Sequence, residues 1–262
     1  MSLSDPATPH WVGAYFGAGY RHLYPRLIDN TDELWASVDW IATQIPWGPG
    51  DRVLDLACGY GRHLEPLLRR PGRPVGIDLL RDQLLQAKRR LGGAPAALIQ
   101  GDMARLPLRS GSFRAVLMLF NSFGYCKPDA AGSDAFGQQV LAEIARVLTP
   151  DGRALLELPN REHIIRAVEE QPQTEIGRGR HRIVERWQID GPRSTLIGET
   201  TFIGDERTET HRFAVRLFSL AEITHLASSA GLRPVGMWGN LTGAPLRGAE
   251  SEQLVLSLER LP

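Results

Sequence analysis

The stretch Asp55-Leu56-Ala57-Cys58-Gly59-Tyr60-Gly61 decides the fold of this 262-residue chain. It completes a short apolar run, residues 53–57, and precedes residues 62–70, where the pattern predicts a helix. Glycine allows a sharp turn and a close approach of a ligand to the backbone, and the first N–H groups of a helix can bind an anionic group. The stretch therefore predicts a ligand site at the end of a buried strand.

Strands and helices are expected to alternate on both sides of this turn. Further apolar runs, each of strand length, occupy residues 75–77, 97–100, 115–119 and 154–158. Helical patterns occupy residues 31–45, 81–91 and 135–148, and Pro150 with Gly152 ends the last of them. This alternation predicts an α/β fold with a doubly wound, Rossmann-like sheet.

The C-terminal part is expected to complete a seven-stranded sheet. Ser219 and Glu222 form a capping box, and Gly231 ends the helix that follows it. Two strands over residues 233–238 and 252–258 then form an antiparallel hairpin. Residues 177–218 alternate apolar and polar side chains between turn signals, which predicts an inserted small antiparallel sheet of three strands. A lid over a pocket and a subunit contact are both open as its role.

The composition limits the classes of partner. The 30 basic residues balance the 30 acidic ones, so no overall charge attracts nucleic acid or an anionic membrane. No apolar run has the length of a signal peptide or a membrane span. The 2 cysteines lack the spacing of a metal site and are expected to be free thiols. We expect a soluble cytoplasmic protein without a metal.

Acidic residues follow three of the expected strands. Asp55, Asp78 and Asp102 each stand at a strand end, and in a parallel sheet those ends meet at one edge. A dinucleotide-binding turn would have a third small residue where this chain has Leu64, so a nicotinamide oxidoreductase is disfavoured.

Residues 53–158 resemble the class I S-adenosylmethionine-dependent methyltransferases. Residues 55–61 resemble the first motif of that family, Gly76-Ile77-Asp78 the second, and Gly101-Asp102-Met103 the turn that contacts adenine. Residues 113–125 resemble the fourth-strand motif, and residues 144–152 resemble the helix and turn before the fifth strand. The resemblance implies S-adenosyl-L-methionine as the cofactor.

The resemblance also implies a role for each motif residue. The two glycines would pack on the methionine part of the cofactor, and Asp55 would bind its amino group. Asp78 would accept hydrogen bonds from the ribose hydroxyls, while Asp102 and Met103 would hold the adenine; a helix or turn cap is the alternative for both aspartates. The cofactor-binding residues implied in this way are Tyr15, Tyr20, Asp55, Ala57, Gly59, Gly61, Asp78, Leu79, Asp102, Met103, Phe120 and Asn121.

The N-terminal aromatic residues have two compatible interpretations. Phe16, Tyr20 and Tyr24 share a helical spacing, which suits a helix that packs on the core. In many small-molecule methyltransferases such a segment also folds over the cofactor. We therefore expect residues 1–48 to be a helical cover for cofactor and substrate, and residues 49–262 to be the methyltransferase domain with its inserted strands.

Catalytic residues are less evident. The stretch 121–125 has no proline, which disfavours the methylation of adenine or glutamine by the known proline-containing motif. Tyr20, His22, Tyr125 and His211 are weak candidates, with packing or surface roles as the alternative. Methyl transfer does not require a general base, because alignment and the exclusion of water can provide most of the rate.

The function expected from these features is methyl transfer to a small-molecule acceptor, at oxygen, nitrogen or carbon. An RNA or protein methyltransferase is the first alternative, although it would call for a basic face or an added binding domain. A non-catalytic cofactor-binding paralogue is the second. A homodimer through the inserted strands is the one protein partner expected, with no nucleic acid and no membrane.

Overall fold

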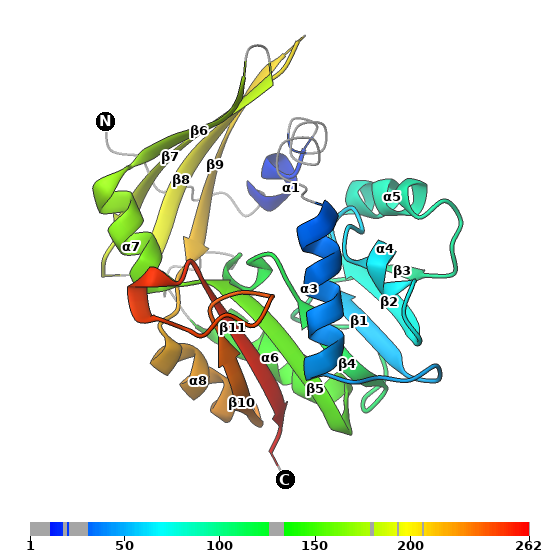
Figure 1. Ribbon diagram of the computed structural model, residues 1–262. Helices are drawn as coiled ribbons and strands as arrows, with labels where there is room; N and C mark the ends of the chain where they lie inside the picture. The colour runs from blue at the N-terminus through cyan, green and yellow to red at the C-terminus, as the bar shows by residue number, and fades with distance from the viewer. Residues whose placement is uncertain are drawn as a thin grey trace.

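A computed structural model describes residues 11–17, 20, 31–125, 134–178, 181–192, 194–205 and 207–261. The described chain contains a seven-stranded sheet and a separate four-stranded antiparallel sheet. The smaller sheet stands beyond one end of the larger one, with the N-terminal helix α1 (Trp11–Tyr15) beside it (Figure 1). The predicted α/β class and the Rossmann-like sheet with an antiparallel insert are confirmed.

The seven-stranded sheet has the order β10-β11-β5-β4-β1-β2-β3. The neighbours among β1 to β5 pair in parallel, whereas β11 is antiparallel to β5 and β10 is antiparallel to β11. The predicted C-terminal hairpin is therefore confirmed. The strands are β1 (Arg52–Leu56), β2 (Arg73–Asp78), β3 (Ala97–Gln100), β4 (Phe113–Met118), β5 (Leu148–Pro159), β10 (Leu232–Trp238) and β11 (Gln253–Arg260).

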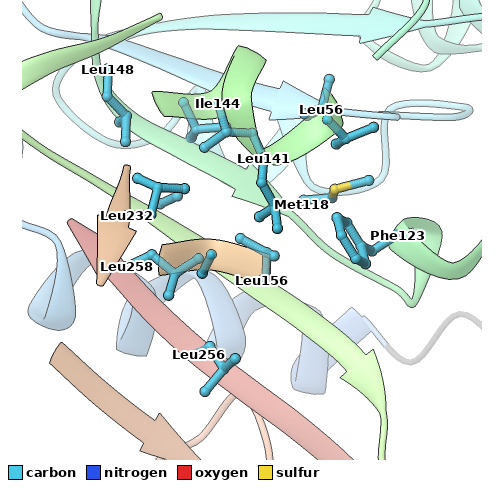
Figure 2. Packing of buried hydrophobic residues seen from close by; sticks show 14 of the residues in the cluster. Leu56, Met118, Phe123, Leu141, Ile144, Leu148, Leu156, Leu232, Leu256 and Leu258 are labelled. Carbon is cyan, nitrogen blue, oxygen red and sulfur yellow. The ribbon is translucent and has the colours of Figure 1, made fainter. Parts of the chain in front are cut away.

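Helices cover both faces of this sheet. Alternate residues of β4 divide between two apolar clusters, since successive side chains of a strand point to opposite faces. One cluster joins the sheet to α3 (Thr31–Gln44), α4 (Leu64–Leu67) and α5 (Arg81–Arg90). The other joins it to α6 (Ala135–Val147) and α8 (Leu220–Ser229), and Figure 2 shows its leucines packed with Met118 and Phe123.

Local signals decide where two of these helices begin and end. The capping box is present: the Ser219 hydroxyl accepts from the Glu222 N–H, and the Glu222 carboxylate accepts from the Ser219 N–H.

The helix expected over residues 62–70 is instead the single turn α4. Pro66 has no N–H to donate to the carbonyl of Arg62, and Pro71 disfavours a helical residue before it. A long helix with a free N-terminus after the glycine turn was therefore a wrong prediction.

The insert is larger than the sequence indicated. It has the four strands β6 (Gln173–Arg178), β7 (His181–Asp190), β8 (Thr195–Ile203) and β9 (Thr208–Arg216), rather than three. The helix α7 (Arg161–Glu170), which was not predicted, leads into it, and the Asn160 side chain caps this helix. The edge strand β6 was missed because its residues are mostly polar and show little alternation.

The two faces of the insert differ in chemistry. Its inner face packs against Tyr15 and Tyr20 in an aromatic cluster that also contains Phe202 and Phe213. Its outer face has ion pairs between glutamates and arginines; Glu199 alone lies 3.4 Å from both Arg186 and Arg212. A homodimer through the insert would therefore use a charged surface, because the apolar face is already covered.

Gly198 provides a test of this inner packing. Gly198 lies opposite Phe213 in the register of β8 and β9, and an added Cβ would overlap the Phe213 ring. We expect Gly198→Ala to lower the free energy of unfolding by about 1–3 kcal/mol, since the ring has to leave its position. Urea unfolding measures the change. Gly191→Ala is the matched control, because a Cβ there meets no atom within 4 Å. Equal stability of the two variants would contradict the packing described.

Candidate functional site

A pocket opens at the carboxyl ends of the central parallel strands, below α1. The N-terminal segment contributes its roof, and the loops after β1, β2, β3 and β4 contribute its walls. This is where ligands bind in open α/β sheets. The lining residues are Val12, Phe16, Tyr20, Leu56, Ala57, Cys58, Gly59, Tyr60, Arg62, His63, Ile77, Asp78, Leu79, Leu80, Gln83, Gly101, Asp102, Met103, Leu119, Phe120, Ser122, Tyr125 and Phe136.

The glycine turn after β1 supplies the floor of the pocket. Ala57, Gly59 and Gly61 have φ values of 61°, 53° and 76°, in the left-handed region that favours glycine. A Cβ on Gly61 would lie 2.9 Å from the Cβ of Ala87, so this glycine allows α5 to pack closely. A Cβ on Gly59 would meet no atom closer than 4.0 Å, the Oε1 of Gln83. Gly59 therefore leaves an open space on the pocket side of the turn.

Asp78 connects the end of β2 to this turn. Its Oδ2 accepts a hydrogen bond of 2.8 Å from the Gly59 N–H, and its Oδ1 accepts one of 2.8 Å from the Leu80 N–H. Burial raises the pKa of Asp78, and the hydrogen bonds from Leu80 and Gly59 oppose that change. The carboxylate thus fixes the turn and also presents charge to the pocket.

Asp102 and Met103 form the far wall of the pocket. Oδ1 of Asp102 accepts a hydrogen bond of 2.9 Å from the Ala104 N–H, which holds the turn after β3. Met103 packs against the apolar core on the side of α6. Gly101 allows this turn to lie close to β2, because a Cβ there would be 2.8 Å from Ile77.

Asp55 lies behind the turn rather than in the pocket wall. It is 1% exposed, and its Oδ2 has no hydrogen-bond partner among the described residues. Burial raises the pKa of Asp55 to about 7; the Arg62 guanidinium opposes this shift, and the Asp78 charge adds to it. A buried carboxylate oxygen without a partner is costly, so it indicates a site for a hydrogen-bond donor or a cation.

Strained backbone follows β4. Phe120 and Asn121 have φ values of 57° and 64°, which side-chain-bearing residues rarely adopt. The Phe120 N–H donates a hydrogen bond of 2.6 Å to Oε2 of the buried Glu157 on β5, and the Arg62 guanidinium lies 3.8 Å from the centre of the Phe120 ring. Burial raises the pKa of Glu157. Such strain is typical of functional sites, where the surrounding structure maintains it.

Gln83 connects α5 to the roof. Its side chain is 2% exposed, and its Nε2 donates a hydrogen bond of 3.3 Å to the carbonyl of Phe16. Its Oε1 has no partner among the described residues. Gln83, Arg62 and Glu157 were not predicted as site residues from the sequence; a polar residue on the apolar face of a helix was the only signal for Gln83.

The aromatic candidates gather at the roof. Tyr20 and Tyr125 line the pocket, whereas Tyr15 lies in the layer behind them, with its ring centre 5.1 Å from that of Phe16. Burial raises the pKa of Tyr125, and the charge of Glu185 adds to this. His22 and Cys126 lie outside the described residues.

The comparisons with known proteins agree with this geometry. Residues 53–152 match the family model described as a methyltransferase domain. An uncharacterised 37.1 kDa protein in a transposon of Streptomyces fradiae is 35% identical over 43% of this chain and 31% of its own. The dTDP-3-amino-3,4,6-trideoxy-alpha-D-glucopyranose N,N-dimethyltransferase of Streptomyces venezuelae is 38% identical over 40% of this chain and 41% of its own. The chain thus spans less than half of these two relatives.

Other matches extend over most of the chain. The cypemycin N-terminal methyltransferase of a Streptomyces species is 29% identical over 85% of this chain and 88% of its own. The crystal structure of an S-adenosylmethionine-dependent methyltransferase from Clostridium acetobutylicum has the same fold, with a TM-score of 0.77 and 14% identity over 93% of this chain and 98% of its own. Residues 53–152 of the chain thus match a methyltransferase domain, and the described chain has the fold of this S-adenosylmethionine-dependent methyltransferase.

The similar solved structure from Clostridium acetobutylicum is named as dependent on S-adenosylmethionine, and the described pocket fits this cofactor. Asp78 and Asp102 offer acceptors for hydroxyl and amino groups, and the open space at Gly59 admits a ligand against the backbone. The partnerless oxygens of Asp55 and Gln83 suit amino or hydroxyl donors. Aromatic rings near the roof suit a cationic sulfur centre.

The structure places the sequence-predicted cofactor residues in two groups. Tyr20, Ala57, Gly59, Asp78, Leu79, Asp102, Met103 and Phe120 line the pocket. Tyr15, Asp55, Gly61 and Asn121 lie outside its lining. Their contact with the cofactor stays a prediction.

Within the described ranges, no three His, Cys, Asp or Glu side chains are grouped closely enough to hold a metal ion. None of the described helices combines the length and the apolar character needed to cross a membrane.

Proposed function

We propose that this protein transfers the methyl group of S-adenosylmethionine to a small-molecule acceptor. The observation that carries the proposal is the pocket itself: a left-handed glycine turn, Asp78 and Asp102 at neighbouring strand ends, and an aromatic roof. The name of the relative from Streptomyces venezuelae, which gives an amino sugar as its substrate, supports a small acceptor.

Each part of the pocket has a role in this proposal. Asp78 and Asp102 hold the nucleoside, and Asp55 attracts the amino group of the methionine part. Phe16 and Tyr20 close the roof and exclude water, which strengthens electrostatic interactions inside. When bound, the cofactor supplies an electrophilic methyl group on a positively charged sulfur.

The same proposal assigns roles to the flanking segments. Residues 1–48 are the cover: the hydrogen bond from Gln83 to the Phe16 carbonyl attaches this segment to the core over the pocket. The insert borders the acceptor side, because its inner face packs against the same aromatic residues. The methyltransferase domain then comprises residues 49–262 and includes the insert.

An N-terminal amine of a peptide is the second candidate acceptor. The similarity over 85% of the chain to a protein named as an N-terminal methyltransferase favours it. Both candidates share an amine nitrogen as the acceptor atom. Incubation with methyl-labelled cofactor and fractionated cell extract, followed by separation of small molecules, peptides and RNA, decides between them. Label in RNA would contradict the proposal.

Cofactor binding is the first test. We expect S-adenosylmethionine and S-adenosylhomocysteine to bind with dissociation constants of about 1–100 μM, a range common for cofactors. NAD should not bind measurably, because Leu64 takes the place of the third small residue of a dinucleotide turn and is buried. Isothermal titration calorimetry with the three ligands measures this. Tight binding of NAD, or none of either sulfur ligand, would overturn the proposed function.

A further inference from the structure

A row of polar side chains crosses the inner face of the insert. Glu185 of β7 lies opposite Thr200 of β8, and Thr200 lies opposite His211 of β9. Residues that are directly opposite in a sheet share one face, so these three side chains are neighbours. The residues around this row on the same face are the apolar Ile183, Trp187, Phe202 and Phe213, and Glu209, which lies opposite Phe202 beside His211.

Hydrogen bonds join the row to the N-terminal cover. Thr200 is fully buried, and its hydroxyl donates to Oε1 of Glu185 over 3.3 Å and lies 3.4 Å from the Tyr15 hydroxyl. Nε2 of His211 lies 3.4 Å from Oε2 of Glu209. The carboxylate of Glu185 is thus held in a defined position by a buried hydroxyl.

Glu185 differs from the other glutamates of the insert. On the outer face, Glu175 pairs with Arg182 at 3.1 Å, and Glu199 pairs with two arginines. Among the residues that the structure describes, no lysine or arginine forms an ion pair with Glu185. A carboxylate in apolar surroundings is costly without a positive partner, so this position suits a cation that arrives with a ligand.

The position of Glu185 relates it to the pocket. Its charge acts on Tyr125, which lines the pocket, and raises the pKa of that hydroxyl in addition to the effect of burial. The Tyr125 ring centre lies 5.6 Å from that of Phe16, another lining residue. Glu185 is therefore beside the aromatic roof on the insert side, where the acceptor is expected.

We propose that Glu185 binds the amino group of the methyl acceptor and takes up one of its protons, an inference that rests on the proposed methyl transfer. An ammonium nitrogen has no free electron pair. Transfer of one N–H proton to the carboxylate leaves a neutral amine with a lone pair and a neutral carboxylic acid, so charge and atoms balance. That lone pair is what the nitrogen needs to form a bond to a methyl carbon.

The surroundings of Glu185 favour this uptake of a proton. Burial raises the pKa of Glu185, while the hydrogen bond from Thr200 opposes the shift. Each unit of increase makes the neutral pair of amine and acid about tenfold more populated relative to the ion pair. Aromatic neighbours add attraction for a cationic amine, since ring faces are negative.

The experiment compares amines with alcohols of the same shape. The probes are cyclohexylamine with cyclohexanol, benzylamine with benzyl alcohol, and tyramine with 4-(2-hydroxyethyl)phenol. Dissociation constants are measured by NMR titration of the full chain saturated with S-adenosylhomocysteine, without any turnover. We expect the wild type to bind the amine of at least one pair roughly tenfold or more tightly, as a charged hydrogen bond provides.

Three variants separate charge from packing. Glu185→Gln keeps the shape and should lose the preference for the amine. Glu175→Gln removes a glutamate from the outer face of the same sheet, and this variant should keep the preference for the amine. Thr200→Val breaks the hydrogen bond to Glu185 but keeps the carboxylate, so it should also keep the preference. Unchanged affinity for S-adenosylhomocysteine shows that each variant is folded.

The outcomes distinguish this inference from the proposed function. No preference for amines in the wild type, or an equal preference in Glu185→Gln, overturns the role of Glu185 while cofactor binding stands. If Thr200→Val loses the preference for amines as completely as Glu185→Gln does, the preference depends on packing. That result also overturns the role of Glu185. Failure of S-adenosylhomocysteine to bind overturns the proposed function, and this inference with it.

Discussion

Replacement of Asp55 by Asn is expected to stabilise the ligand-free protein at about pH 8 by up to about 4 kcal/mol, and to have little effect near pH 4. Burial raises the pKa of Asp55 from 3.8 to about 7. The folded protein therefore binds this proton more tightly than the unfolded chain does. As pH rises from about 4 to 7, the unfolded chain is favoured by about 1.4 kcal/mol per unit, and above pH 7 the loss is complete.

Urea unfolding of the ligand-free wild type and Asp55→Asn at about pH 4, 6 and 8 measures this difference. The difference in the free energy of unfolding between the two proteins should widen as pH rises and then level off. Asp82→Asn is the control, since Asp82 is an exposed aspartate on α5. The same Asp55→Asn change should weaken cofactor binding, because it removes the negative charge proposed to attract an amino group. A difference in the free energy of unfolding that does not depend on pH would contradict the raised pKa of the buried Asp55.

The strand-end acids could be predicted from sequence because two local patterns suffice. Apolar runs of strand length that alternate with helices imply parallel strands, and parallel strands end at one edge. Asp78 and Asp102 follow such runs directly, so their meeting at the pocket required no knowledge of packing. The capping box at Ser219 is equally local.

The site residues that were missed depend on tertiary burial. Glu157 and Gln83 are ordinary polar residues in sequence, and only the packed structure shows that both are buried. Glu185 belongs to an alternating strand, and alternation gives two faces without saying which one points inward. The insert covers α1 with the face that contains Glu185, a fact that depends on residues more than a hundred positions away.

The left-handed backbone at Phe120 is a third feature of the site that could not be predicted from the sequence. Its φ of 57° has no signature in the side chain, since aromatic residues seldom adopt it. The hydrogen bond from its N–H to Glu157 accounts for part of the stabilisation. The helix after the glycine turn was overpredicted for a local reason, the two prolines that confine α4 to one turn.

Replacement of Asp78 by Ala is expected to raise the dissociation constant for S-adenosylhomocysteine by roughly 10- to 100-fold, equivalent to about 1–3 kcal/mol. In the proposed complex the ribose hydroxyls lose their charged acceptor. In addition, the Gly59 and Leu80 N–H groups lose the partners that hold the glycine turn in shape. Both effects weaken binding, so Asp78→Ala should be more severe than Asp78→Asn, which keeps one acceptor oxygen.

Calorimetry on the wild type, the two Asp78 variants and Asp82→Ala measures these effects. Asp82 is the matched control because it lies four residues further along the chain, outside the pocket lining, and should bind the cofactor product as the wild type does. Circular dichroism and urea unfolding establish that the Asp78 variants remain folded. If Asp78→Ala binds with unchanged affinity in a folded protein, Asp78 serves only to cap the turns at Gly59 and Leu80. The nucleoside would then depend on Asp102, and Asp102→Ala would be the more severe change.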